Sequence, residues 1–261
     1  MEEIIIFHDV LNKKSEKDYV NFFVSNLQYL ETPQYLRKFL FPKSEDLMAS
    51  GIMNPLESSH HLRIDQWCPY REGVVLNRPV KDNEGSWVNI GLYKDCKIDK
   101  KLEEKTRLTI KLKEKDFDPK LKFYNGEVVS MTEPKEKCGL YWGYVVRVVE
   151  NFNEVFENSF YEEGYDLIIG TSDKGQNYEE ADYRKFKNFN HCLILFGGLQ
   201  GIEGILESDE AYKESNPDNI FNLNLNTCIG QGLRTIRTEE AIMISLAVLK
   251  PKLDNLQLMD S

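Results

Sequence analysis

The stretches HCLILFGGLQGIEG (His191–Gly204) and NLNTCIGQGLRTIRTEEAIMISLAVL (Asn224–Leu249) decide the fold of this 261-residue chain. The first starts with an apolar run of strand length, and the second begins within the predicted strand Ile220–Leu225. Each continues into a loop of glycines and small polar residues, and the second loop leads into a helix. Only glycine lets the main chain approach a ligand closely or adopt positive φ freely, and helix N-termini present unpaired N–H groups. Two such loops side by side can line a pocket for a compact polar ligand.

Around these stretches, helical and strand patterns alternate along the chain. The alternation predicts an α/β domain with a mainly parallel sheet covered on both faces, and an N-terminal strand at Glu2–Phe7 is predicted to join that sheet. The other predicted strands are Asp166–Ile169, Cys192–Phe196 and Ile220–Leu225, and the predicted helices are Lys17–Leu30, Tyr35–Phe41, Tyr141–Phe156 and Thr238–Leu249, the last stopped by Pro251.

Residues 71–137 have a different texture, with short β-rich runs separated by turn residues. Thr106, Leu108, Ile110 and Leu112 alternate with polar residues, which is the half-buried strand pattern. Several short strands at this spacing predict an inserted OB-like β-barrel of about five strands at 71–137, and leave 1–70 and 138–261 for the α/β domain. Aromatic residues of this segment include Trp87, Tyr93, Phe123 and Tyr124. Such residues suit stacking with single-stranded RNA, although we expect at least half of them to lie in the core.

The charge pattern fits one basic face on an acidic protein. The net charge of −10 argues against a general nucleic-acid coat. Between Lys97 and Lys122, however, ten Lys or Arg stand against six Asp or Glu, a local excess of four positive charges. A solvated surface of mixed charge is the alternative interpretation.

Membrane, secretory and metal-binding classes find no support in the sequence. No stretch reaches the ~18 apolar residues of a membrane span, and the acidic N-terminus lacks a signal-peptide pattern. The five scattered cysteines form no C-x-x-C pair, as expected for reduced thiols in an intracellular protein. His60 and His61 would point apart in an extended chain and have no third ligand at metal spacing, so we predict no metal site.

Motifs spread in order over nearly the whole chain carry a resemblance to a known family. They are LQYLETPQYLRKFLFPKSEDL (Leu27–Leu47), GIMNPLESSHHLR (Gly51–Arg63), REGVVLNRP (Arg71–Pro79), GLYWGYVVR (Gly139–Arg147), GYDLIIGTSDKG (Gly164–Gly175), FGGLQGIE (Phe196–Glu203) and NTCIGQGLRTIRTEEAI (Asn226–Ile242). With them the chain resembles the SPOUT methyltransferases, and in particular the eukaryotic branch with a β-barrel insert, some members of which are linked to ribosomal RNA uridine methylation and to spindle function.

The resemblance implies a trefoil-knotted α/β sheet, S-adenosylmethionine as cofactor, RNA as partner and a homodimer. It implies that the cofactor lies at three strand ends, which agrees with the general rule for open α/β sheets. The glycines follow G-G-x-x-G-x-x-G spacing, which differs from the G-x-G-x-x-G spacing of a dinucleotide-binding loop, so a dinucleotide site is not expected. The cofactor-binding residues it implies are Thr171, Lys174, Gly197, Gly198, Leu199, Gly201, Asn226, Thr227, Ile229, Gly230 and Thr238.

The resemblance also suggests two arginines for the reaction. Arg147, predicted near a helix start, matches an RNA-binding arginine of knotted methyltransferases; the alternative is a surface residue paired with Glu150 on the same helix. Arg237, three residues after Arg234, could hold a substrate phosphate or the cofactor carboxylate. No general base is assigned, because Leu199 and Gln200 stand where many relatives carry a glutamate and Glu203 comes later.

Together these features predict a methyltransferase that acts on a uridine base, at ring nitrogen 3, in ribosomal RNA. Two alternatives stay open at this point: a non-catalytic interaction protein of the spindle or centrosome that keeps the knot, and a protein methyltransferase. The protein is expected inside the cell, in the nucleus or nucleolus, the cytoplasm or at the spindle.

Overall fold

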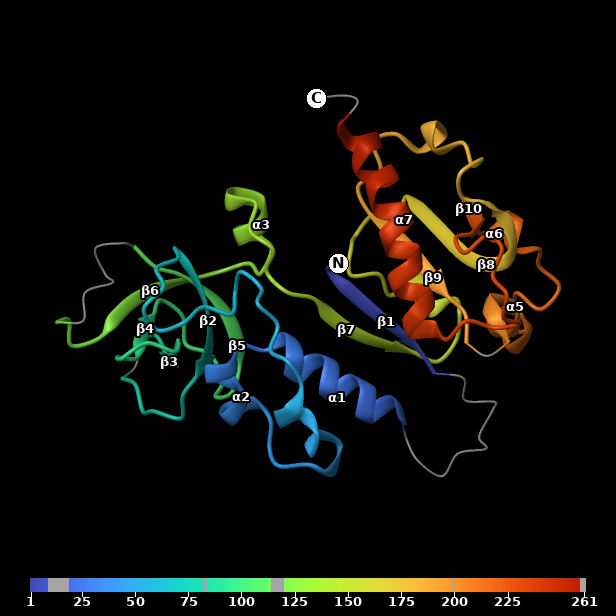
Figure 1. The fold of residues 1–261 in the computed structure, drawn as a ribbon. Helices are drawn as coiled ribbons and strands as arrows, with labels where there is room; N and C mark the ends of the chain where they lie inside the picture. The colour runs from blue at the N-terminus through green and yellow to red at the C-terminus, as the bar shows by residue number, and fades with distance from the viewer. Residues whose placement is uncertain (9–18, 82–83, 114–119, 199, 259–261) are drawn as a thin grey trace. The chain divides into compact units, whose positions relative to one another are not determined.

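The computed structural model describes residues 1–8, 19–81, 84–113, 120–198 and 200–258 (Figure 1). The chain forms two compact units. The barrel unit comprises Met1–Ile4 with Lys17–Arg147, and the α/β unit comprises Ile5–Glu16 with Val148–Ser261.

A closed five-stranded barrel forms the centre of the barrel unit, which confirms the predicted barrel. Its strand order is β2-β3-β4-β6-β5, with β4 parallel to β6 and every other neighbouring pair antiparallel. Alternate side chains fill the interior, including Val88, Ile110 and Tyr124, because successive strand residues face opposite sides. The strands are β2 (Tyr70–Val75), β3 (Trp87–Asn89), β4 (Cys96–Ile98), β5 (Arg107–Lys111) and β6 (Tyr124–Val129).

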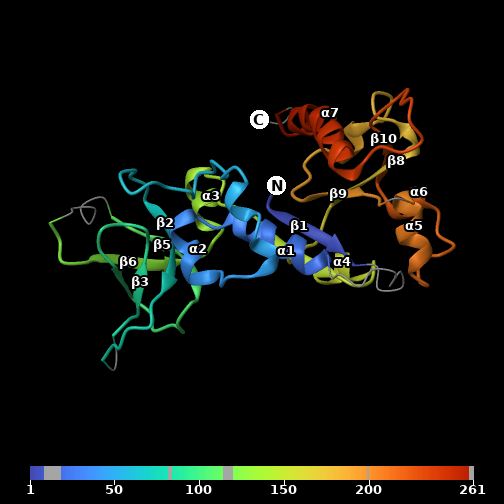
Figure 2. The same cartoon turned by 60° about the horizontal axis from the view of Figure 1, so that its bottom comes forward.

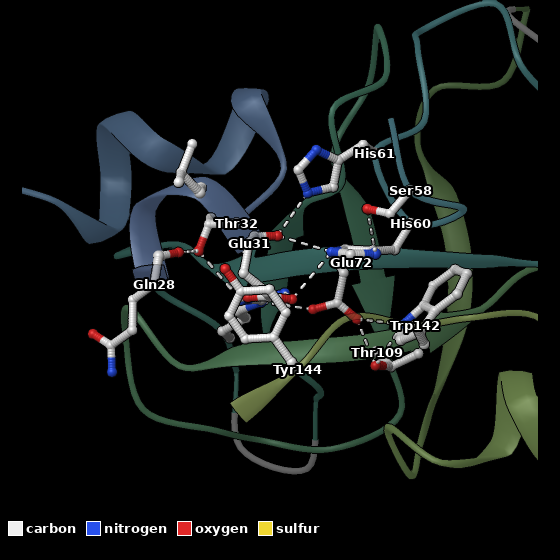
Figure 3. Close-up of polar contacts among 12 residues, drawn as sticks. Gln28, Glu31, Thr32, Ser58, His60, His61, Glu72, Thr109, Trp142 and Tyr144 are labelled. Atoms are coloured by element: carbon white, nitrogen blue, oxygen red, sulfur yellow. Dashed lines mark hydrogen bonds and ion pairs between the residues drawn. The ribbon is translucent and has the colours of Figure 1, made fainter. Parts of the chain in front are cut away.

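Short helical segments complete the barrel unit. They are α1 (Tyr19–Glu31), α2 (Gln34–Leu40), α3 (Glu133–Cys138) and the 3₁₀ turns η1 (Glu45–Leu47) and η2 (Ser50–Ile52). Polar side chains link the end of α1 to the outside of the barrel (Figure 3). We call this group the buried ion network, and its members are Glu31, His60, Glu72, Arg107, Thr109 and Trp142.

Arg107 holds the buried ion network together. Its guanidinium donates to both oxygens of Glu31, at 2.5 and 2.9 Å, and to Oε2 of Glu72 at 2.7 Å. The other oxygen of Glu72 accepts from Thr109 Oγ1 at 2.6 Å and from Trp142 Nε1 at 2.7 Å. Although burial alone would raise the pKa of Glu31, hydrogen bonds from His60 and Arg107 lower it. The Glu31 carboxylate is therefore ionised, and both carboxylates are satisfied by partners inside the unit.

The two adjacent histidines do not point apart, contrary to the sequence-based expectation. The Nε2 atoms of His60 and His61 lie 2.8 and 2.6 Å from the backbone oxygen of Glu31, the last residue of α1. Because a carbonyl only accepts hydrogen bonds, each Nε2 carries a proton. The two rings thus satisfy a helix-end carbonyl that has no partner within the helix.

Strands β1 (Glu3–Phe7) and β7 (Val145–Val149) form a separate two-stranded sheet. Two predictions were wrong here: Tyr141–Phe156 is not one helix, and the N-terminal strand does not join the larger sheet. The run VVRVV is rich in β-branched residues, which restrict χ1 and favour strands. Pairing with β1 decides the conformation, and only the short helix α4 (Glu154–Glu157) forms in the second half of the predicted segment.

The α/β unit is built on a parallel sheet of three strands in the order β10-β8-β9, which confirms the parallel α/β prediction. Its strands are β8 (Leu167–Asn177), β9 (Cys192–Phe196) and β10 (Leu223–Asn226). Around it lie α5 (Gly201–Ser208), α6 (Pro217–Ile220), α7 (Thr238–Leu258) and the 3₁₀ turn η4 (Tyr183–Phe186) (Figure 2).

Alternate residues of β8 and β9 enter two different hydrophobic clusters, as expected for a sheet covered on both faces. Leu167 and Ile169 pack with Leu249 of α7, whereas Ile168 lies in the cluster that contains Ile202 of α5. Helix α7 continues through Pro251 instead of stopping there, contrary to the prediction. Its buried residues beyond the proline, Leu253 and Leu256, belong to the same cluster as Leu249, so packing outweighs the proline's local cost.

Candidate functional site

The three strand ends predicted to form the cofactor site meet at one edge of the parallel sheet. Thr171 of β8 stands opposite Phe196, the last residue of β9. Along β10, Asn224 pairs with Gly170 but Leu225 pairs with Gln176. The five residues of β8 from Thr171 to Gly175 therefore leave the ladder with β10, so the predicted loop lies within β8 and not after it.

Hydrogen bonds tie these segments to one another. Asn226 donates from Nδ2 to the carbonyl of Asp173 at 3.0 Å, and Thr171 Oγ1 donates to the carbonyl of Leu195 at 2.7 Å. Thr238, the first residue of α7, donates from Oγ1 to the carbonyl of Gly197 at 3.2 Å. The structure thus brings together predicted residues from all three segments and from the start of the last helix.

Glycine is required in the loop after β9 and leaves open space beside it. A Cβ at Gly197 would lie 2.2 Å from the backbone carbon of Gly201, and Gly201 itself has φ +73°. At Gly198 and at Gly230 of the next loop, an added Cβ meets no atom within 4 Å. The backbone of these loops is therefore accessible, as a ligand-facing loop requires. Leu199, also predicted here, lies outside the described residues.

A small charged cluster lies beside the glycine loop. Glu203 of α5 accepts from Ser172 Oγ at 3.3 Å and pairs with Lys174 Nζ at 3.2 Å. Burial would raise the pKa of Glu203, but its own backbone N–H and Lys174 lower it, so the carboxylate is ionised at neutral pH. The sequence singled out Lys174 but missed Ser172, although both stand in the same TSDKG segment.

The loop between β10 and α7 is anchored at one end and exposed at the other. Thr227 Oγ1 lies 2.7 Å from Ser245 Oγ of α7, and Asn226 Oδ1 accepts from the Cys228 N–H at 3.0 Å. Ile229 is half exposed. Arg237 is exposed, and its N–H donates to Glu240 Oε2 at 3.3 Å, as in the first turn of a capped helix.

A shallow, mainly apolar cavity of about 520 Å³ lies next to this loop, within the usual size range of small-molecule sites. Its walls come from the loop and the first turns of α7: Cys228, Gln231, Gly232, Leu233, Ile236, Glu240, Met243 and Ile244. Exposed apolar side chains continue from it over the same segment, namely Ile229, Leu233, Ile242, Met243 and Leu246. An apolar surface of this extent on one element is typical of a binding face.

Arg147 lies in strand β7, not near a helix start, so both predicted settings for this arginine were wrong. Its Nε donates to Glu3 Oε1 at 2.8 Å across the β1–β7 pair, and the Glu3 side chain is 6% exposed. Arg147 belongs to the barrel unit, whereas the strand-end loops belong to the α/β unit. Its role in the reaction stays a prediction.

Among the described residues, no group of three or more His, Cys, Asp or Glu side chains is arranged to hold a metal ion. Nor does any described helix combine the length and the hydropathy that crossing a bilayer requires.

Comparison with known proteins gives a family. A sequence profile of the family described as "Putative RNA methyltransferase" matches residues 1–249. Three relatives carry the printed name 28S rRNA (uridine-N(3))-methyltransferase. The human protein is 49% identical over 87% of this chain and 59% of its own length, the mouse protein 49% over 87% and 58%, and the Drosophila melanogaster protein 45% over 87% and 46%. The chain therefore spans less than two thirds of each relative.

Proposed function

We propose, because this chain belongs to that family of RNA methyltransferases, that it transfers a methyl group from S-adenosylmethionine to ring nitrogen 3 of a uridine in ribosomal RNA. The observation that supports this most directly is the convergence of the three strand ends and α7 on an accessible glycine-lined edge. The trefoil knot implied by the sequence resemblance is part of this proposal, as is action in the nucleus or nucleolus.

The chemistry of the edge fits S-adenosylmethionine. Backbone groups beside Gly198 and Gly230 can pair with the edge of an adenine and with ribose hydroxyls, because both glycines are exposed. The Thr238 hydroxyl and Asn226 hold the loops in place. The ionised Glu203 suits the positive charge of the ligand. When bound, the cofactor supplies an electrophilic methyl group on a sulfonium.

The protein residues must then orient the uridine while its N3 proton passes to water and the nitrogen forms its bond to the methyl group. Glu203 is a poor general base, because its pKa lies below the ordinary value of 4.5. We therefore favour stabilisation of the developing negative charge by a guanidinium. Arg237 is the candidate within the α/β unit, since it is exposed and starts the helix that contacts the Gly197 loop. Arg147 is the second candidate.

A homodimer is the third part of the proposal. The exposed apolar side chains of the β10–α7 loop and of the first half of α7 give a face that a second copy of the chain can bury. Leu233 and Met243 are 71% and 74% exposed in the single chain. Burying them against a symmetric copy stabilises the pair by removing apolar area from water.

Calorimetry with S-adenosylmethionine tests the cofactor site through the variant Gly198→Trp. An indole at this position enters open space, so it should block the pocket without disturbing the fold. Gly51→Trp is the matched control, since Gly51 also has no neighbouring atom within 4 Å and lies in the barrel unit. We expect saturable binding by the wild type and by Gly51→Trp, and a loss of at least about tenfold in affinity in Gly198→Trp.

Two outcomes would contradict the proposal. A folded wild-type chain that does not bind the cofactor would favour a non-catalytic interaction protein. Equal binding by all three proteins would move the cofactor away from the glycine edge. Transfer of a labelled methyl group to unmethylated ribosomal RNA, followed by nucleoside identification, then tests the uridine assignment.

A further inference from the structure

The outer surface of the barrel carries an aromatic and cationic cluster apart from the cofactor edge. The spatial strand order is β2-β3-β4-β6-β5, and β4 and β6, the third and fifth barrel strands along the chain, are parallel. This is the arrangement of an OB-fold. Such barrels bind oligonucleotides on the face of their second and third strands and on the flanking loops. In this chain those strands are β3 and β4.

Trp87 is the centre of this face. Its neighbour Val88 is fully buried in the barrel core, so Trp87 points outward. Lys97 of β4 stands directly opposite Trp87 in the ladder. Phe123, just before β6, meets the indole edge-to-face with ring centroids 5.3 Å apart and is 36% exposed. Tyr124 is buried in the core, but Trp87, Phe123 and Tyr93 are not, so the expectation that at least half of these aromatic residues lie in the core was wrong.

Two cations surround the indole. The guanidinium carbon of Arg78 lies 4.1 Å from the Trp87 ring centroid, and Lys97 Nζ lies 5.6 Å from it. Arg78 precedes β3 and its side chain is 51% exposed. Such cation–π contacts hold the charges close to the aromatic surface, where a stacked base would bring its phosphate.

The ion pairs of these cations can be exchanged for phosphate. Arg78 Nη1 lies 3.5 Å from Asp95 and Lys97 Nζ lies 2.9 Å from Glu84. Both carboxylates are about a third or more exposed, at 34% and 39%. Exposed pairs of this kind contribute little to stability. A phosphodiester can therefore replace a carboxylate at little cost, whereas in the buried ion network it cannot.

We infer that Trp87, Phe123, Arg78 and Lys97 form a binding site for single-stranded RNA, with a base stacked on the aromatic pair and backbone phosphates held by the two cations. The inference rests on the proposed function for its ligand, an RNA. It adds a site in the barrel unit that anchors a nucleotide other than the one to be methylated. Stacking explains the outward-facing, partly exposed aromatic pair, and phosphate binding explains the two cations beside it.

Fluorescence anisotropy of a labelled single-stranded oligouridine tests this site on the full chain. We expect Trp87→Ala and Phe123→Ala each to weaken binding, Trp87→Ala by about tenfold, and Trp87→Phe to restore part of the loss. Phe23→Ala is the matched control, since Phe23 is an exposed phenylalanine that also makes an edge-to-face pair, with Phe22. It should leave the affinity unchanged.

The salt dependence separates stacking from charge. Trp87→Ala should lower the affinity without changing the slope of log affinity against log salt, whereas Lys97→Ala should make that slope shallower by about 0.7. The inference is overturned if Trp87→Ala binds oligouridine as well as Phe23→Ala does. It is also overturned if a folded wild-type chain does not bind oligouridine, or binds duplex RNA equally well without any effect of Trp87.

Cofactor calorimetry on the same proteins keeps the two proposals distinguishable. Trp87→Ala should bind S-adenosylmethionine as the wild type does, because the cofactor edge lies in the other unit. RNA binding through Trp87 without cofactor binding would contradict the proposed function and leave the RNA site supported. Cofactor binding with no effect of Trp87→Ala on RNA affinity would contradict the RNA site and leave the proposed function supported.

Discussion

The buried ion network of the barrel unit and the strand-end loops of the α/β unit use similar residues in opposite ways. In the network, the Glu31 and Glu72 side chains are 7% and 5% exposed, and Arg107 contacts both. At the strand ends, Glu203 is 26% exposed and its partner Lys174 is 72% exposed. In the network the polar groups bind one another, whereas at the strand ends backbone groups and charges stay available to a ligand.

This difference distinguishes polar residues that stabilise the fold from polar residues that can bind a ligand. A buried carboxylate that loses its cation is strongly destabilising, because the remaining charge cannot reach water. An exposed pair contributes about 0–1 kcal/mol, because water replaces the lost partner. Polar residues whose partners all lie inside one unit are therefore expected to control stability, and those at an accessible glycine-rich edge to control ligand affinity.

The largest expected effect comes from removing the cation of each region. Arg107→Met leaves Glu31 and Glu72 without their shared partner and should lower the free energy of unfolding by about 3 kcal/mol, at the low end for buried pairs because the Arg107 side chain is 27% exposed. Lys174→Met, the matched change at the strand ends, should cost less than about 0.5 kcal/mol. Urea unfolding of both variants measures the difference, and equal losses would break the comparison.

Matched glycine substitutions give the next largest effect. Gly143 has φ +95°, and a Cβ there would lie 2.2 Å from Glu31 Oε1 and 3.1 Å from His60 Cε1. Gly143→Ala combines backbone strain with displacement of a buried carboxylate, so we expect about 2 kcal/mol of destabilisation. Gly198→Ala enters open space at the cofactor edge and should change stability by less than about 0.5 kcal/mol.

Thermal unfolding in the absence and presence of S-adenosylmethionine checks both glycine variants. Gly143→Ala should be less stable in both conditions by the same amount. Gly198→Ala should match the wild type alone but gain less from the cofactor, because stabilisation by a ligand follows its affinity. A Gly198→Ala protein that unfolds like Gly143→Ala would mean that the loop after β9 is structural.

Patterning within a single segment could predict much of this structure. The alternation of Leu108, Ile110 and Leu112 indicated the barrel strand and its buried face, and the run Cys192–Phe196 indicated β9 with its bounds. Both signals are local, because burial on one or both faces of a strand fixes which residues are apolar. The same reasoning found the loops after β9 and β10, where glycine and small polar residues follow the strand directly, but it placed Thr171–Gly175 after β8 and not within it.

Features that depend on partners far along the chain were out of reach. The valines around Arg147 suit a helix or a strand, and pairing with β1, more than a hundred residues earlier, decides between them. Arg107 counted toward a basic face, yet it neutralises Glu31 and Glu72. Thr109 alternates with Leu108 and Ile110, which placed it on the barrel's outer face, where the sequence alone indicated solvent. Glu72, between Arg71 and Gly73, gave no local signal of burial.

The smallest expected effect is a pH dependence of stability from His61. Burial lowers the pKa of His61 below its ordinary value of 6.5, opposed by its hydrogen bond to the Glu31 carbonyl and reinforced by the nearby His60 and Arg37. A lowered pKa means that the unfolded chain takes up the proton first as the pH falls. His61 therefore contributes stability above pH 6.5 that is lost on acidification toward its folded pKa.

Glu31 gives a second decline at lower pH with the same sign, since its pKa lies below 4.5 in the folded chain. His61→Gln keeps an N–H donor for the Glu31 carbonyl but does not titrate. It should flatten the decline just below pH 6.5 and keep the decline below 4.5. Urea unfolding across this range measures both steps. Stability that rises as the wild type is acidified through 6.5 would contradict this prediction, because it would require a raised pKa for His61, as in an imidazole paired with a carboxylate.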